Sequence, residues 1–206
     1  MALLFVRHGS TALNAGDPAD PRDYFRGWTQ APLSDYGVQT IKQTADWFRP
    51  VPLQAIYSSD LPRAVQTAQE IAKTTGAQVI PDQRLRPLHV GMLTEQLITP
   101  ELKEILNKAH EHKDMVIPGG ESYNNFLQRY GSIMPDLLST GQSGNIAVVT
   151  HHRNLLALPH MFFGKKSEVK GPPEPGGVMA LTQTGLYPIF TPPAVAASSY
   201  KEHAAS

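Results

Sequence analysis

Short apolar runs alternate along this chain with longer segments in which apolar residues recur at helical spacing. The apolar runs predict buried strands over residues 2–6, 54–57, 78–80 and 145–149, with two possible edge strands at 178–182 and 186–190. The longer segments predict helices over residues 35–48, 62–74, 100–109, 121–138 and 152–163. Strands that alternate with helices are typical of an α/β fold, here a three-layer α/β/α sandwich with a mostly parallel central sheet.

The loop-forming residues between these segments indicate one domain and no internal repeat. Gly, Pro and Asp are frequent between residues 14 and 32 and again between 164 and 177, which predicts two long loops. Pro135 falls inside the predicted helix 121–138 and is expected to kink or end it. We expect the domain to occupy residues 1–190, and the Pro-, Ala- and Ser-rich residues 191–206 to form a mobile tail.

The composition of the chain argues against several classes of function. The chain has 206 residues and a formal net charge of +0, so no bulk electrostatic attraction to nucleic acid or to an anionic membrane is expected. It contains no cysteine, which excludes disulfides, thiolate nucleophiles and cysteine-bound zinc. We find no bilayer-spanning stretch and no signal peptide, and therefore expect a cytoplasmic protein. Any recognition of anions must depend on a few local positive groups.

Such groups occur where predicted strands end. Arg7 and His8 follow the first strand, Arg63 lies just beyond the second, and His151 follows the strand 145–149. In open α/β sheets the carboxyl ends of the strands form the ligand site, so these side chains are expected to converge. Guanidinium groups match phosphate oxygens and keep their charge at working pH. Backbone amides at the start of the following helix, near His152, could add donors. The pattern predicts a site for a phosphate dianion.

The same residues belong to an ordered set of motifs that resembles the histidine phosphatase superfamily, whose fold is phosphoglycerate mutase-like. The motifs run in order over most of the chain up to about residue 163, which makes the resemblance more specific than a lone Arg-His-Gly tripeptide. They are Arg7-His8-Gly9 with Thr11 and Asn14, Arg26-Gly27-Trp28, Pro32-Leu33-Ser34 with Gly37, residues 57–64 with Thr67, residues 118–122, and residues 148–151.

The resemblance implies a role for each matching residue. His8 would be the nucleophile that carries the phosphoryl group as a phosphohistidine. Arg7, Arg63 and His151 would bind the phosphoryl oxygens and stabilise the transition state. Asn14 and the amide of His152 would add phosphate contacts. The resemblance thus implies a phosphatase acting on a small phosphorylated substrate, with no metal or other cofactor, because the arginines supply the positive charge.

One position departs from the family pattern and leaves the proton donor open. The stretch 85–91 aligns with a family segment whose third residue is a general-acid glutamate, and here that residue is Pro87. His89, Glu95 or Glu121 could donate the proton instead, and His89 is preferred because imidazole titrates near neutral pH. Alternatively, the substrate has a good leaving group, as in phosphohistidine phosphatases, or the chain binds phosphate without turnover. A mutase is less expected, because residues 93–118 form a short segment.

Overall fold

The structure, a computed structural model, describes residues 2–14, 17, 20, 22–164, 173–182 and 185–195. Most of the expected tail, residues 196–206, and the centre of the second long loop, residues 165–172, lie outside the described residues. Within the described part of the chain, no helix is both long and apolar enough to cross a membrane.

A six-stranded sheet forms the centre of the molecule, in the order β3-β2-β4-β1-β5-β6. The strands are β1 (Leu3–Arg7), β2 (Leu53–Ser58), β3 (Val79–Pro81), β4 (Asn145–Thr150), β5 (Val178–Leu181) and β6 (Leu186–Phe190). The first four pair in parallel, and β5 runs antiparallel to both β1 and β6. The expectation of two edge strands at the C-terminal end is half wrong, because β5 pairs on both sides and only β6 lies at the edge.

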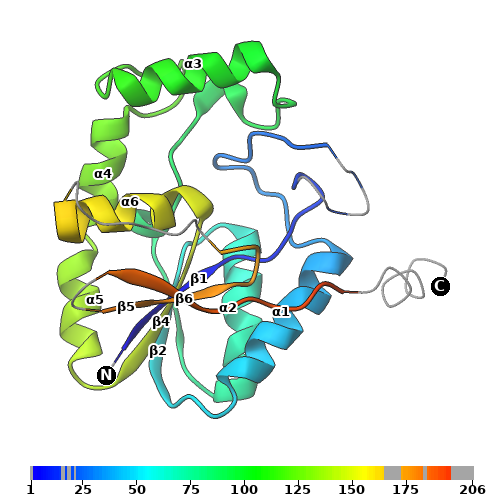
Figure 1. Cartoon of the computed structure of the whole chain (residues 1–206), viewed down its shortest axis with the longest axis vertical. Coiled ribbons are helices and arrows are strands. Elements are labelled where there is room, and N and C mark those ends of the chain that lie inside the picture. Colours follow the sequence, from blue (N-terminus) through cyan, green and yellow to red (C-terminus); the bar gives the residue numbers. More distant parts are fainter. Residues whose placement is uncertain are drawn as a thin grey trace.

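Helices cover both faces of this sheet, which confirms the three-layer α/β fold (Figure 1). On one side lie α1 (Asp35–Phe48) and α2 (Pro62–Thr75). On the other side lie α4 (Tyr123–Gly131), α5 (Met134–Gly141) and α6 (His152–Phe163). The helix α3 (Pro100–Glu111) crosses beyond the end of the sheet, and the short 3-10 helices η1 (Gln83–Leu85) and η2 (Gly91–Leu93) lie in the connection that leads to it.

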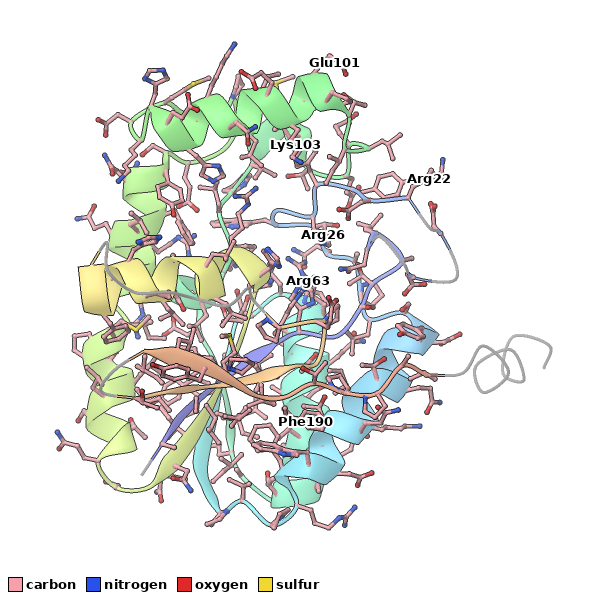
Figure 2. All side chains as sticks on the ribbon, viewed as in Figure 1. Arg22, Arg26, Arg63, Glu101, Lys103 and Phe190 are labelled. Atoms are coloured by element: carbon pink, nitrogen blue, oxygen red, sulfur yellow. The ribbon has the colours of Figure 1, made fainter. Side chains whose placement is uncertain are left out.

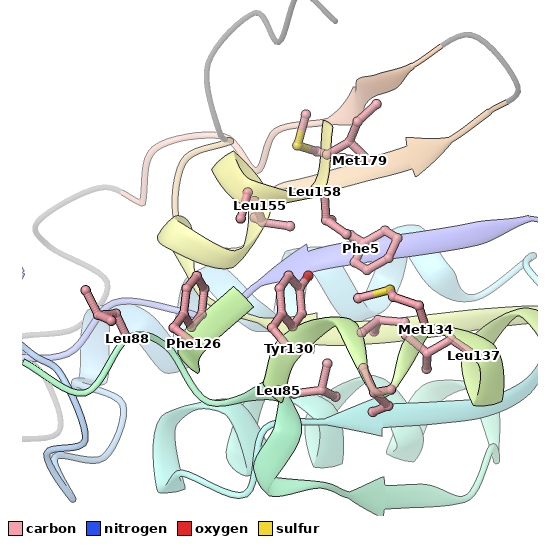
Figure 3. Close-up of a cluster of buried hydrophobic side chains, with 14 of the residues drawn as sticks. Phe5, Leu85, Leu88, Phe126, Tyr130, Met134, Leu137, Leu155, Leu158 and Met179 are labelled. Atoms are coloured by element: carbon pink, nitrogen blue, oxygen red, sulfur yellow. The ribbon is translucent and has the colours of Figure 1, made fainter. Parts of the chain in front are cut away.

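The strands β1 and β4 are buried on both faces, as their unbroken apolar runs predict. Alternate residues point to opposite sides, so Phe5 and Val148 join one apolar cluster while Val6 and Val149 join the other. Figure 3 shows the first cluster, in which side chains from α4, α5 and α6 meet against β1. This double burial fixes the two strands that carry the candidate site.

The predicted helix 121–138 is two helices, α4 and α5, with a break at Ser132 and Ile133. Pro135 lies in the first turn of α5. It has no N–H to donate to the carbonyl of Gly131, four residues earlier, so a continuous helix would lose a hydrogen bond and acquire a steric clash there. Of the two outcomes expected at Pro135, the helix therefore ends rather than kinks.

Strand register brings the expected site residues to one edge of the sheet. Arg7 lies opposite Thr150 across the β1–β4 pair, and Ser58 lies opposite Val149 across the β2–β4 pair. The residues that follow, His8 and His151, therefore leave the sheet at the same level. This is the carboxyl end of the parallel strands, where ligands bind in open α/β sheets.

Candidate active site

His8 directly follows β1 and is held in one orientation. Its side chain is buried, and its Nδ1 lies 2.7 Å from the carbonyl oxygen of Gly9. Because a carbonyl can only accept, Nδ1 carries the proton and Nε2 keeps its lone pair. Burial, followed by the charge of Arg63, lowers the pKa of His8 well below its usual value. The imidazole is therefore neutral, with Nε2 available as a nucleophile.

His151 follows β4 and packs against His8, with ring centroids 4.9 Å apart. Its Nδ1 lies 3.3 Å from Arg63 Nη2, which must be the donor. The proton of the neutral ring then sits on Nε2, which is buried and has no hydrogen-bond partner among the described residues. An unsatisfied buried donor costs about 1–3 kcal/mol. A bound acceptor, such as a phosphoryl oxygen, would remove that cost.

Arg63, in the first turn of α2, lies between the two histidines. Its side chain is buried, and it donates hydrogen bonds to the carbonyls of Gly27 at 2.9 Å and Thr29 at 3.0 Å. Its Nε also lies 3.3 Å from His8 Nε2. Burial, and then the charge of Arg26, lowers the pKa of Arg63 to about 9. No carboxylate of the described residues forms an ion pair with it, so it is a buried cation without a counterion.

Arg7, the last residue of β1, repeats this pattern. Its Nη1 donates to the carbonyl of Pro173 at 3.0 Å, whereas its Nε is buried with no partner among the described residues. Burial, and then the charge of Arg26, lowers the pKa of Arg7 to about 10. Figure 2 shows Arg63 and Arg26 on the side of the sheet that faces α3. Unmatched donors and cations thus gather at one edge of the sheet.

These groups open into a cavity of about 350 Å³. Its ionisable lining residues are Arg7, His8, Asp23, Tyr24, Arg26, Arg63, His151, His152 and Arg153. The rest of the lining is mostly apolar and comprises Phe25, Gly27, Pro87, Leu88, Val90, Ile98, Leu106 and Leu156. A site dominated by cationic groups favours an anion. Within the described part of the chain, no group of three or more His, Cys, Asp or Glu residues could hold a metal ion.

Two expected phosphate contacts lie in different positions. His152, the first residue of α6, lines the cavity. Burial, and then the charge of Arg7, lowers its pKa to about 4. Asn14 does not line the cavity. Its Oδ1 instead accepts hydrogen bonds from both the backbone N–H and the hydroxyl of Thr11, each at 3.0 Å. Asn14 therefore closes the turn that follows the nucleophile strand.

None of the three expected proton donors lines the cavity. His89 stacks on Trp28 with ring centroids 4.4 Å apart, and its Nδ1 accepts the backbone N–H of Gly91 at 3.0 Å. Burial lowers the pKa of His89. The hydroxyl of Thr29 donates to the carboxylate of Glu95. Both side chains are engaged in holding loops around the site.

Glu121, at the start of the segment that leads into α4, ties two loops together. Its carboxylate accepts from Arg129 at 2.6 Å and from the backbone N–H of His89 at 2.9 Å. Arg129 and the indole N–H of Trp28 also donate to the carbonyl of Pro87. Pro87 itself lines the cavity. The site thus has a proline where the family pattern has an acid, and a network of hydrogen bonds holds that proline in place.

The structure adds two cavity residues that the sequence did not single out as functional. Asp23 accepts a hydrogen bond from Arg26 at 2.6 Å, and it is the one carboxylate among the described lining residues. Arg153, in the first turn of α6, adds a further guanidinium. Asp23 lies in a long predicted loop, and Arg153 lies next to the motif histidine, so neither carries a pattern of its own.

Comparison with known proteins identifies the family of this chain. Residues 3–170 match the model of the histidine phosphatase superfamily, branch 1. A probable phosphoglycerate mutase GpmB from Escherichia fergusonii is 31% identical over 155 residues, which cover 73% of this chain and 69% of that protein. The one from Serratia proteamaculans is 30% identical over 155 residues, covering 73% and 69%.

Solved structures share the fold over nearly the full length. A phosphoglycerate mutase from Thermus thermophilus aligns with a TM-score of 0.68 at 25% identity, covering 94% of this chain and 99% of that one. A mycobacterial glucosyl-3-phosphoglycerate phosphatase aligns with a TM-score of 0.70 at 22% identity, covering 87% and 88%, and has also been solved with vanadate and with inorganic phosphate. The chain therefore belongs to the histidine phosphatase superfamily, branch 1.

Proposed function

We propose that this protein hydrolyses phosphate monoesters through a phosphohistidine on His8. The observation that carries the proposal is the set of unmatched groups around one cavity. Among the described residues, the N–H groups of His151 Nε2 and Arg7 Nε have no partner and the charge of Arg63 has no counterion. They line the cavity beside His8 Nε2, whose lone pair accepts only the long hydrogen bond from Arg63 Nε at 3.3 Å. A phosphoryl group fits this set because it offers an electrophilic phosphorus together with anionic acceptor oxygens.

The reaction would proceed in two displacements. His8 Nε2 attacks phosphorus, and the bond from phosphorus to the leaving oxygen breaks, while the Nδ1 proton stays hydrogen-bonded to Gly9. Arg7, Arg63 and His151 stabilise the charge that develops on the phosphoryl oxygens. Water then attacks the phosphohistidine, which releases inorganic phosphate and restores His8. Arginines supply all the positive charge in this scheme, so no metal is needed.

Protonation of the leaving group needs a donor inside the cavity. Asp23 is engaged by Arg26 and by the backbone N–H of Tyr24, whereas no hydrogen bond to the His152 ring occurs among the described residues. The pKa of His152, about 4 in the empty cavity, would rise beside a phosphate dianion. We therefore favour His152 over His89 as the donor, and we expect esters with good leaving groups to be the better substrates.

Hydrolysis of an aryl and an alkyl phosphate ester tests the assignment of the nucleophile and of the proton donor. We expect 4-nitrophenyl phosphate to be hydrolysed in the presence of EDTA, with activity abolished in His8→Ala and retained in the control His112→Ala, which changes an exposed histidine after α3. His152→Gln should slow an alkyl phosphate about 10²–10⁴-fold more than the aryl ester. His89→Ala should slow both esters equally. Wild-type activity in His8→Ala would refute the nucleophile, and a selective alkyl defect in His89→Ala would return the acid role to His89.

Three alternative functions predict different outcomes when the substrates also include phosphorylated protein histidine and phosphoglycerate. A phosphohistidine phosphatase would turn over phosphorylated protein histidine and leave both esters nearly untouched. A non-catalytic module would bind phosphate without turnover. The names of the sequence relatives also make a mutase the second candidate. That activity would interconvert 2- and 3-phosphoglycerate faster than either one is hydrolysed.

A further inference from the structure

A second groove, of about 670 Å³, adjoins the candidate active site and shares two lining residues with it, Arg153 and Leu156. Both residues belong to α6, which begins at His152, next to the edge of the sheet where the candidate active site lies. The lining residues of the groove are His110, Lys113, Tyr123, Leu127, Arg153, Leu156, His160, Met161 and Gly164. A ligand that leaves the phosphate site along α6 therefore passes Arg153 on its way into the groove.

Arg153 is a partly buried cation that no carboxylate of the described residues balances. Its Nη1 lies 3.0 Å from Nε2 of His110. Burial, and then the charge of Arg153, lowers the pKa of His110 to about 4, so the ring is neutral and offers Arg153 a lone pair but no negative charge. Burial also lowers the pKa of Arg153 itself. Among the described residues, Arg153 thus has a hydrogen-bond acceptor but no counterion.

The charged residues that line the catalytic cavity and the groove are mostly cationic, although the chain as a whole has a net charge of +0. The groove contributes Lys113 and Arg153, and no carboxylate occurs among its described lining residues. In the catalytic cavity, Asp23 is already paired with Arg26. The arginines expected to bind the phosphoryl group leave Arg153 as an additional positive charge. That excess would attract a ligand with more negative charge than one phosphoryl group carries.

Resting on the proposed function, we propose that Arg153 binds a second anionic group of the substrate. The substrate class would be a phosphate monoester whose leaving group carries a carboxylate or another phosphoryl group. The apolar wall near Leu156 would contact the carbon skeleton between the two anions. Arg26 is a weaker candidate for this role, because its Nη1 is engaged by both Asp23 and the carbonyl of Leu13.

Binding of non-hydrolysable phosphonates tests the proposal without any need for turnover. We would measure the dissociation constants of phenylphosphonate, of 3- and 4-carboxyphenylphosphonate and of 1,4-phenylenebisphosphonate by calorimetry. The wild type should bind at least one doubly anionic ligand about 10- to 100-fold more tightly than phenylphosphonate, because a hydrogen bond to a charged group has about that effect. The carboxylate and bisphosphonate arms distinguish the two kinds of second anion.

Substitutions at Arg153 then locate the effect. Arg153→Met should abolish the preference for the doubly anionic ligands while changing the affinity for phenylphosphonate less than about threefold, and Arg153→Lys should restore part of the preference. Lys108→Met, which changes an exposed cation on α3, is the matched control and should behave as wild type. Equal affinity of the wild type for singly and doubly anionic ligands, or an equal loss for both in Arg153→Met, would overturn the proposal. Failure to bind phenylphosphonate would instead refute the proposed function.

Discussion

Arg63→Met should separate activity from stability, because Arg63 is a buried cation held for a ligand. At neutral pH the guanidinium remains charged although its pKa is lowered to about 9, which corresponds to a penalty on the order of 5 kcal/mol for the charged form. Methionine removes that penalty. It also removes the hydrogen bonds to the carbonyls of Gly27 and Thr29, at a cost of about 1–3 kcal/mol each, and the longer, weaker ones to His8 and His151 at 3.3 Å. The two effects nearly cancel.

We therefore expect unliganded Arg63→Met to melt within a few degrees of the wild type, while kcat/KM for 4-nitrophenyl phosphate falls by a factor of about 10³ or more. Inorganic phosphate at 100 times its Kd should add about 2.7 kcal/mol to the free energy of unfolding of the wild type. For a domain of this size, that stabilisation is a rise in Tm of about 5–10 °C. Arg63→Met should show almost no rise.

Thermal unfolding followed by circular dichroism, with and without phosphate, measures both effects. Arg49→Met is the matched control, since Arg49 is exposed and pairs only with Asp46 at 2.5 Å among the described residues. The reasoning about the buried charge is refuted if Arg63→Met melts more than about 10 °C below the wild type. The assignment of the phosphate site is refuted if phosphate still stabilises Arg63→Met as it stabilises the wild type.

Two further predictions concern pH and the loop network. The pKa values of His8 and His151 are lowered mainly by burial, so just below pH 6.5 only the unfolded chain takes up protons at these rings. The free energy of unfolding should therefore be highest above that pH. It should fall on acidification by up to about 1.4 kcal/mol per pH unit for each ring. A Tm that stays constant from pH 7.5 to 5 in urea-free, phosphate-free buffer would contradict this. Glu121→Gln weakens the pair with Arg129 and should lower stability by about 1–3 kcal/mol, with an unchanged ratio of alkyl to aryl ester hydrolysis. A changed ratio would implicate Glu121 in proton transfer.

The parts of the fold that the sequence predicts well are those with local causes. The apolar run before Arg7 and the one before His151 are buried strands whose ends meet, as expected. The break before Pro135 follows from the missing N–H of proline. Apolar residues nevertheless recur at helical spacing on both sides of the break, so the pattern predicts one helix where the structure has two. The antiparallel partners of β5 depend on contacts far along the chain, which local periodicity does not encode.

The orientations of the candidate proton donors could not be predicted from the sequence. His89 is close in sequence to the position of the family acid, but its ring turns onto Trp28 and accepts the N–H of Gly91. Gly91 has a φ of 52°, and a Cβ there would lie 2.1 Å from the carbonyl oxygen of Pro118. The two loops thus pack backbone against backbone beside His89. Spacing along the chain gives no account of such packing.

Trapping a phosphohistidine would establish whether His8 is the nucleophile. The protein would be mixed with a ³²P-labelled aryl phosphate, quenched in base within milliseconds to seconds, digested and mapped by mass spectrometry. We predict a label on the peptide that carries His8, stable in base and labile in acid, lost during a chase with unlabelled substrate and absent from His8→Ala. An acid-stable label, or turnover by His8→Ala at the wild-type rate, would contradict the account.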